Sequence, residues 1–197
     1  MSLRAFIALE LPVAIQDAIT DRTAKLRTTL ARPLVRWVPL HNVHLTLKFL
    51  GEVSPANLGN LAQVLKVEAR EHAPFTFSVG GLGVFPNPRR PRVIWIGLET
   101  PPALVALARG IETICVRLGY DPENRPFSPH LTIGRVNQNT SAAELQHVRF
   151  ALERTQVGAF GAVTVDAVHI FKSELLPGGT IYSHLYSAPL ESGDERK

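Results

Sequence analysis

Two copies of a short His-x-Thr motif hold the residues of this sequence that are best suited to chemistry. The segment His44–Leu47 reads His-Leu-Thr-Leu, and 86 residues later His130–Ile133 reads His-Leu-Thr-Ile. Each copy is typical of a β-strand, on which the His and the Thr share one face and the apolar residues share the other. Two such strands facing each other would present two imidazoles and two hydroxyls. Imidazoles exchange protons near neutral pH, so this set suits in-line displacement at phosphorus.

Other catalytic chemistries find little support in the residue pattern. His41 and His44 have the spacing of a helix face rather than a strand, and neither motif contains an acidic residue or a cysteine, which disfavours a metal site. Cys115 is the single cysteine, and its apolar neighbours at helical spacing predict a core thiol. The segment Gly80–Gly83 precedes no helix and indicates a bulge rather than a phosphate loop. We therefore expect no metal and no cofactor.

The repeat extends beyond the two motifs. Phe6–Pro12 resembles Trp95–Pro101, and each predicts a short apolar strand that ends where a helix begins near a proline. After each His-x-Thr strand a helix is expected, one opening at Ser54-Pro55 and the other at Thr140 or Ser141. A period near 87 residues indicates a duplicated half-domain rather than a solenoid.

Each half is predicted to end in a β-hairpin. The first is expected from about Phe75 to Leu98 around the turn Pro86–Pro91, and the second from about Val163 to Tyr186 around Pro177–Gly179. We expect one domain over residues 1–197, made of halves at about 4–90 and 91–190.

Composition bounds the class of protein. With 45% apolar and 19% charged residues the chain is globular, and no apolar run approaches the roughly 20 residues of a membrane helix. The first residues lead into a strand pattern without the layout of a signal peptide, so a cytoplasmic location is expected. The net charge of +4 permits a nucleic-acid partner. Arg89, Arg90 and Arg92 in the proline-rich turn are candidate contacts to a polyanion, although such turns are commonly only solvated.

Three blocks of the sequence resemble the 2H phosphoesterases, which are named for two His-x-Thr motifs. They are Arg4–Pro12, Arg36–Gly51 and Phe127–Arg135, and the likeness spans nearly the whole chain. Within that superfamily the chain looks like the RNA 2′,3′-cyclic phosphodiesterases, also called LigT-like proteins or 2′-5′ RNA ligases. The resemblance implies a two-lobed α+β fold with pseudo-twofold symmetry, in which antiparallel sheets line a central cleft and helices lie outside.

The resemblance also implies an activity and a site. The expected reaction is hydrolysis of an RNA 2′,3′-cyclic phosphate to a 2′-phosphate without a metal, and weak reverse ligation could run in the same site. The implied catalytic residues are His44 and His130, with Thr46, Thr132 and Arg135 binding the phosphate. Family analogy suggests His130 as the base and His44 as the acid, but the pseudo-symmetry leaves this direction open in the sequence.

Arg135 does not follow from strand alternation. It lies five residues after His130, so strict alternation sends it to the opposite face unless a bend or bulge at Gly134 redirects it. Two alternatives to the RNA reaction stay open: a phosphodiesterase for a small cyclic nucleotide, and a non-catalytic RNA- or nucleotide-binding module. The expected partner is an RNA or oligonucleotide with a cyclic phosphate end, with no membrane, no obligate protein partner and a monomeric state.

Overall fold

The computed structural model describes residues 2–176 and 179–191. Its helices are α1 (Val13–Thr29), α2 (Leu58–Ala69), α3 (Pro102–Arg117) and α4 (Ala142–Glu153), with short 3₁₀ turns at Leu40–Asn42 and Pro55–Asn57. Its strands are β1 (Leu3–Leu9), β2 (Val35–Trp37), β3 (Leu45–Val53), β4 (Phe75–Phe85), β5 (Val93–Leu98), β6 (Leu131–Val136), β7 (Ala159–Val165), β8 (Ala167–Leu176) and β9 (Gly179–Pro189). The α+β class predicted from the sequence is confirmed.

The strands of the described chain join into one curled antiparallel sheet. Its order is β7-β4-β5-β6-β3-β1-β8-β9, and β2 adds to the free part of β6. The two His-x-Thr strands, β3 and β6, meet at the centre, where Leu45 pairs with Leu131. The sheet therefore places the two motifs side by side, at the junction of its two halves.

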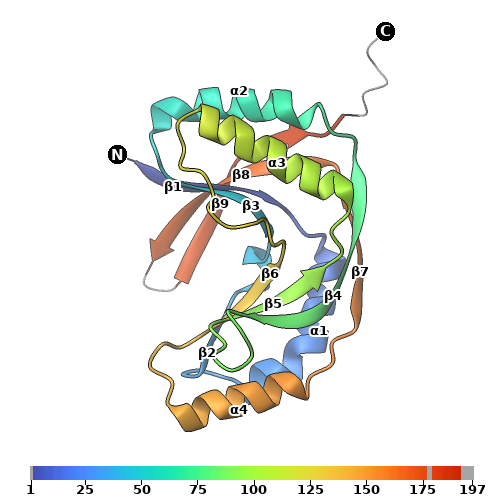
Figure 1. The fold of residues 1–197 in the computed structure, drawn as a ribbon, viewed down its shortest axis with the longest axis vertical. Coiled ribbons are helices and arrows are strands. Elements are labelled where there is room, and N and C mark those ends of the chain that lie inside the picture. The colour runs from blue at the N-terminus through green and yellow to red at the C-terminus, as the bar shows by residue number, and fades with distance from the viewer. Residues whose placement is uncertain (1, 177–178, 192–197) are drawn as a thin grey trace.

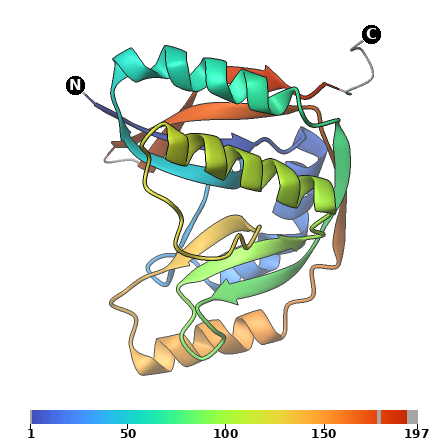
Figure 2. The ribbon, with the colours of Figure 1, turned by 45° about the horizontal axis from the view of Figure 1, so that its top comes forward.

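The two sheet halves are covered by different helices (Figures 1 and 2). We call β3, β1, β8 and β9 with α2 and α3 the His44 lobe, because α3 packs on β3 and α2 packs on α3, β8 and β9. We call β7, β4, β5, β6 and β2 with α1 and α4 the His130 lobe, because α1 packs on β7 and α4. Each lobe therefore contains elements from both halves of the sequence: α1 follows β1 along the chain but lies in the opposite lobe.

Several local predictions are confirmed. α2 begins beyond Ser54-Pro55 after a 3₁₀ turn. Ser141 is the N-cap of α4, and its side chain accepts from the Glu144 N–H in a capping box. Cys115 is fully buried in α3, as a core thiol should be. The ladders of β4 with β5 and β7 shift register at 79–82, where the sequence predicted a bulge.

The second predicted hairpin differs from the structure. The observed hairpin pairs β8 with β9, whereas Val163 belongs to β7, which pairs with β4. The sequence pattern missed the break because Asp166 alone separates β7 from β8. Residues 177 and 178 of the predicted turn lie outside the described residues.

Candidate active site

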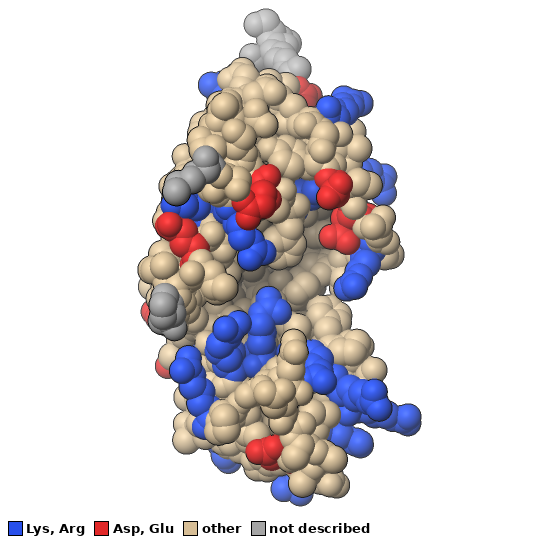
Figure 3. Space-filling model, turned by 90° about the vertical axis from the view of Figure 1, so that its left-hand side faces the viewer, with Lys and Arg blue, Asp and Glu red and all other residues tan. Residues whose placement is uncertain are grey.

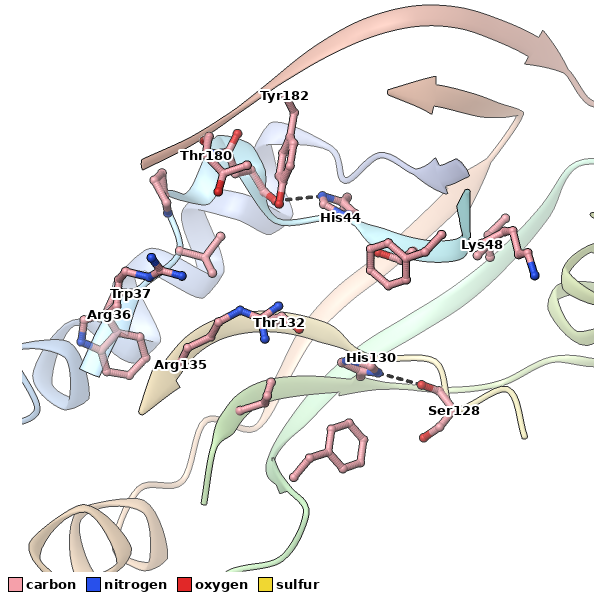
Figure 4. Close-up of a pocket in the computed structure, with 18 of the residues that line it drawn as sticks. Arg36, Trp37, His44, Lys48, Ser128, His130, Thr132, Arg135, Thr180 and Tyr182 are labelled. Atoms are coloured by element: carbon pink, nitrogen blue, oxygen red, sulfur yellow. Dashed lines mark hydrogen bonds between the residues drawn. The ribbon is translucent and has the colours of Figure 1, made fainter. Parts of the chain in front are cut away.

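A cleft of about 1560 Å³ lies between the two lobes. It is lined by His44 and Thr46 from one lobe and by His130, Thr132 and Arg135 from the other. In Figure 4, His44 projects into this space from one wall, and His130 and Arg135 project from the wall across it. The structure therefore brings together all five residues that the resemblance implied for catalysis and phosphate binding.

Both candidate catalytic histidines are oriented by the same kind of hydrogen bond, from the ring Nδ1 to the backbone carbonyl oxygen two residues earlier. The His44 ring Nδ1 lies 2.8 Å from the Asn42 carbonyl oxygen, and the His130 Nδ1 lies 2.7 Å from the Ser128 carbonyl oxygen (Figure 4, dashed lines). A carbonyl can only accept, so in each ring Nδ1 carries the hydrogen and donates it. The Nε2 atom of each neutral ring is then a free acceptor for proton exchange.

The two imidazoles differ in their surroundings. The His44 ring stacks on Phe6 at 4.6 Å between ring centroids and meets the Tyr182 ring edge-on at 5.1 Å. The His130 ring meets Phe85 edge-on at 4.9 Å and packs less closely on Trp95. Burial lowers the pKa of His44 to about 4, although the hydrogen bond to the Asn42 carbonyl opposes this shift. His44 is therefore neutral at neutral pH in the free protein.

A β-bulge redirects Arg135 toward the cleft. Along β6, Gly134 pairs with Ile94 and Thr132 pairs with Trp95, so Ile133 is the extra residue. This extra residue reverses the alternation, and Arg135 comes to the same face as Thr132. The sequence placed the required irregularity at Gly134, and the structure places it one residue earlier.

The first motif contains the matching bulge. Along β3, Lys48 pairs with Ile7 and Thr46 pairs with Ala8, which leaves Leu47 as the extra residue. Phe49 therefore holds the position in β3 that Arg135 holds in β6, and its exposed side chain also lines the cleft. The pseudo-symmetric pair supplies a cation from one lobe and an aromatic ring from the other.

Arg36 and Tyr182 are among the polar side chains of the cleft that sequence reasoning did not single out. Arg36 stands opposite Arg135 in the β2–β6 ladder, and Tyr182 lies on β9 beside His44. Burial raises the pKa of the Tyr182 hydroxyl, while the positive charges of Arg135 and Arg36 work against that shift. Arg36 opens the block Arg36–Gly51 that resembles the 2H phosphoesterases, and this position was a sequence signal that could have identified it. We find no sequence signal for Tyr182, because only the β8–β9 pairing places it there.

Positive charge dominates the lining of the cleft. Among the described residues, the charged groups that line it are Arg32, Arg36, Lys48, Arg125, Arg135 and one carboxylate, that of Glu123. Figure 3 shows lysine and arginine side chains gathered around the hollow between the upper and lower parts of the molecule. Such a cleft attracts anions and raises their local concentration.

The proline-rich turn lies beside the cleft rather than in it. Phe85, Pro86 and Val93 at its base line the cleft, whereas the exposed Arg89, Arg90 and Arg92 do not. The Asn87 carboxamide oxygen accepts from the backbone N–H groups of Arg89 and Arg90, so the turn has a defined local structure. Contact of these arginines with a polyanion stays a prediction.

The remaining polar clusters lie elsewhere. His169 and His184 face each other across β8 and β9, with 3.1 Å between His169 Nδ1 and His184 Nε2, and neither lines the cleft. In the described part of the chain, no three His, Cys, Asp or Glu side chains gather where they could hold a metal ion. No helix within residues 2–176 and 179–191 is long and apolar enough to cross a membrane.

Comparisons with known proteins agree with this geometry. The chain matches the family described as LigT like phosphoesterase over residues 9–95 and again over residues 96–182. A protein named RNA 2′,3′-cyclic phosphodiesterase from Methanothermobacter thermautotrophicus is 36% identical over 94% of this chain and 97% of its own length. Its namesake from Thermotoga maritima is 32% identical over 97% of each chain.

Solved structures show the same fold. Crystal structures of TT0787 from Thermus thermophilus and of E. coli LigT complexed with 3′-AMP superpose with TM-scores of 0.78 and 0.71. Their sequence identities are 28% and 27%, and the alignments cover 97% and 98% of this chain and the whole of each structure. With its two repeated His-x-Thr strands and two consecutive family matches, the chain belongs to the LigT-like phosphoesterase family.

Proposed function

We propose that this protein hydrolyses RNA 2′,3′-cyclic phosphate ends to 2′-phosphates, with two histidines as acid and base and without a metal. The observation that carries this proposal is the pair of imidazoles, His44 and His130, one from each side of the cleft and each held through Nδ1 by a backbone carbonyl. The relatives named RNA 2′,3′-cyclic phosphodiesterase support the substrate class. The basic lining of the cleft supports an anionic substrate.

The reaction is an in-line displacement at the cyclic phosphorus. One imidazole takes a proton from water as the water oxygen forms its bond to phosphorus. The bond from phosphorus to the 3′-oxygen breaks, and the second imidazole gives its proton to that oxygen. The products are a 2′-phosphate and a free 3′-hydroxyl.

Thr46, Thr132 and Arg135 are the groups that stabilise the developing charge. Two hydroxyls and one guanidinium can donate to the non-bridging phosphate oxygens as negative charge builds. Arg36, directly opposite Arg135 in the sheet, adds a second guanidinium to this wall. In this site the guanidinium groups and hydroxyls can stabilise the negative charge on the phosphate oxygens that a metal ion would otherwise neutralise.

The direction of proton transfer is proposed by family analogy, with His130 as the base and His44 as the acid. The His44 pKa of about 4 in the free protein places a condition on that assignment. An acid at this position must take up its proton together with the substrate. A bound phosphate anion favours the charged imidazolium and so raises the pKa of His44.

The size of the cleft favours an oligonucleotide over a small cyclic nucleotide. Pockets for small molecules hold about 300–1,000 Å³, whereas this cleft holds about 1560 Å³. Arg32 and Arg125 line it as well as the arginines nearer the threonines, which provides contacts for additional phosphates. The same site could join a cyclic phosphate end to a 5′-hydroxyl RNA when that hydroxyl replaces water.

The test is hydrolysis of an oligonucleotide that ends in a 2′,3′-cyclic phosphate, compared with a cyclic mononucleotide. We expect a 2′-phosphate product, a higher kcat/KM for the oligonucleotide, and full activity in a chelator. The variants His44→Ala and His130→Ala should each lose activity, and the double variant should be much less than multiplicatively worse, because the pair acts as one unit. A 3′-phosphate product would reverse the proposed regiochemistry. Binding without turnover would leave a nucleotide-binding module.

A further inference from the structure

A buried lysine connects the His44 strand to the loop that delivers His130. We infer that Lys48 is a positioning residue, which sets the place of His130 by holding the segment 119–129 against β3; this inference rests on the proposed function. Lys48 follows Thr46 by two residues in β3, and its side chain is only 4% exposed. Its ammonium group lies 2.7 Å from the backbone carbonyl oxygen of Asp121 and 2.7 Å from the Glu112 carboxylate.

Glu112 extends this connection farther along the same loop. One carboxylate oxygen receives Lys48, and the other accepts the Glu123 N–H at 2.8 Å. Burial alone would raise the pKa of Glu112, but Lys48 and the Glu123 N–H outweigh it and lower the pKa. The carboxylate is therefore ionised at neutral pH and holds both donors at once.

The loop needs such an anchor because it has no regular structure of its own. Residues 121–130 belong to neither helix nor strand, and residues 121–128 are exposed. This loop contains Ser128, whose carbonyl oxygen fixes the His130 ring, and it carries Arg125 into the lining of the cleft. Figure 4 shows Lys48 on the strand that carries His44 and the Ser128–His130 hydrogen bond on the opposite wall. Displacement of the loop would move the acceptor that orients His130.

The opposite lobe has a reciprocal anchor at the equivalent position. Gly134 in β6 matches Lys48 in β3, since each is paired directly after the bulged residue. A Cβ at Gly134 would lie 2.8 Å from the Trp37 ring, so the glycine admits Trp37 from the segment that leads to His44. That segment is also bound to β6 by the β2 ladder and by the Val38 N–H to the Ile133 carbonyl oxygen. Each histidine is thus approached by a loop that the other motif's strand holds.

The functional consequence is geometric. Acid and base must bracket one phosphate, and an error of about 1 Å can cost on the order of 100-fold in rate. Lys48 does not need to touch the substrate to matter, because it fixes how far the His130 loop stands from the His44 strand. The contact is hidden from solvent on the Lys48 side, so salt should screen it little.

The experiment compares Lys48→Met, Glu112→Ala and Glu112→Gln with the parent protein. Lys48→Met keeps an apolar stem and removes the ammonium, and Glu112→Ala removes the other arm of the same connection. For Lys48→Met and Glu112→Ala we expect kcat on a cyclic mononucleotide to fall about 10- to 100-fold with little change in KM. Glu112→Gln keeps one acceptor oxygen, so its kcat should lie between that of Glu112→Ala and that of the parent. The double variant Lys48→Met/Glu112→Ala should be no worse than the poorer single variant, because both act through one link.

Two readouts do not depend on turnover. Amide hydrogen exchange in residues 121–128 should quicken, and the imidazole NMR signals of His130 should shift, in both Lys48→Met and Glu112→Ala. The control is Arg149→Met, which breaks an exposed ion pair with Glu153 in α4 and should change neither signal nor rate.

Folded variants with unchanged loop exchange, His130 signals and kcat would overturn the inference. If Lys48→Met fails to fold, Glu112→Ala carries the test, since the Glu112 side chain is 31% exposed and the Lys48 ammonium keeps its hydrogen bond to the Asp121 carbonyl oxygen. If the parent protein does not hydrolyse cyclic phosphates, the proposed function fails. The loop and imidazole signals would then still decide whether Lys48 positions His130.

Discussion

The low pKa of His44 makes a quantitative prediction about stability. The folded protein holds this pKa at about 4, whereas an unfolded chain has an ordinary histidine near 6.5. Between these values the unfolded state binds the proton and the folded state does not, so falling pH favours unfolding. The lost stability is about 2 kcal/mol at pH 5 and approaches about 3.4 kcal/mol below pH 4, from about 1.36 kcal/mol per pKa unit.

The variant His44→Gln cannot take up this proton. We compare the free energy of unfolding of this variant with that of the parent. On going from pH 7 to pH 5 this difference should move by about 2 kcal/mol in favour of the variant, because only the parent loses stability through protonation of His44 in the unfolded state. Urea unfolding of both proteins at the two pH values measures the change, and all other titrating groups are shared. Thr46→Val, which changes a cleft residue that does not titrate, should keep the same stability difference at both pH values.

An equal stability difference between His44→Gln and the parent at pH 7 and pH 5 would refute the argument from burial. The proposed role of His44 as the acid is tested by an NMR titration. Addition of a nucleoside 2′-phosphate should raise the pKa of His44, since the anion lies beside the ring. If the pKa stays near its value in the free protein, His44 is the base and His130 the acid.

Three further predictions concern individual parts of the site. His130→Ala should lower kcat by about 10²–10⁴-fold with little change in the urea midpoint, and full activity in that variant would remove His130 from the mechanism. Arg135→Met should lower kcat/KM by about 10–10³-fold, with Arg135→Lys in between, because a lysine keeps the charge but not the bidentate geometry; equal rates in all three would exclude a phosphate contact. Changing Arg89, Arg90 and Arg92 together to Ala should weaken oligonucleotide binding, spare a cyclic mononucleotide and flatten the salt dependence, and identical salt slopes would confine substrate binding to the cleft.

The His-x-Thr pattern was accessible to sequence reasoning because it depends on local periodicity. Strand alternation put His44 with Thr46 on one face, and both line the cleft. The helix start at Thr140 or Ser141 followed from the capping residue types and the apolar spacing after them, and the structure has Ser141 as the N-cap. The duplication then required two such strands, and the sheet pairs them at its centre.

What the sequence left open depends on long-range pairing. Arg135 reaches the cleft through a bulge at Ile133, and alternation cannot reveal where a ladder skips a residue. The strand that carries Arg36 has three residues, too short for a periodic signal. The likeness of Phe6–Pro12 and Trp95–Pro101 identified corresponding strands but not their register, since Ala8 faces Thr46 where Trp95 faces Thr132.

The exchange of elements between lobes has a consequence for motion. The chain leaves the His44 lobe after β1, returns with β3, leaves again with β4, and crosses twice more around α3 before β8 brings it back. A hinge needs one or two linkers that bend while rigid bodies stay intact, and here many connections and the Leu45–Leu131 pairing would have to yield together. The entrance must therefore already be wide enough for an RNA end, and release of product should not wait for the lobes to swing apart.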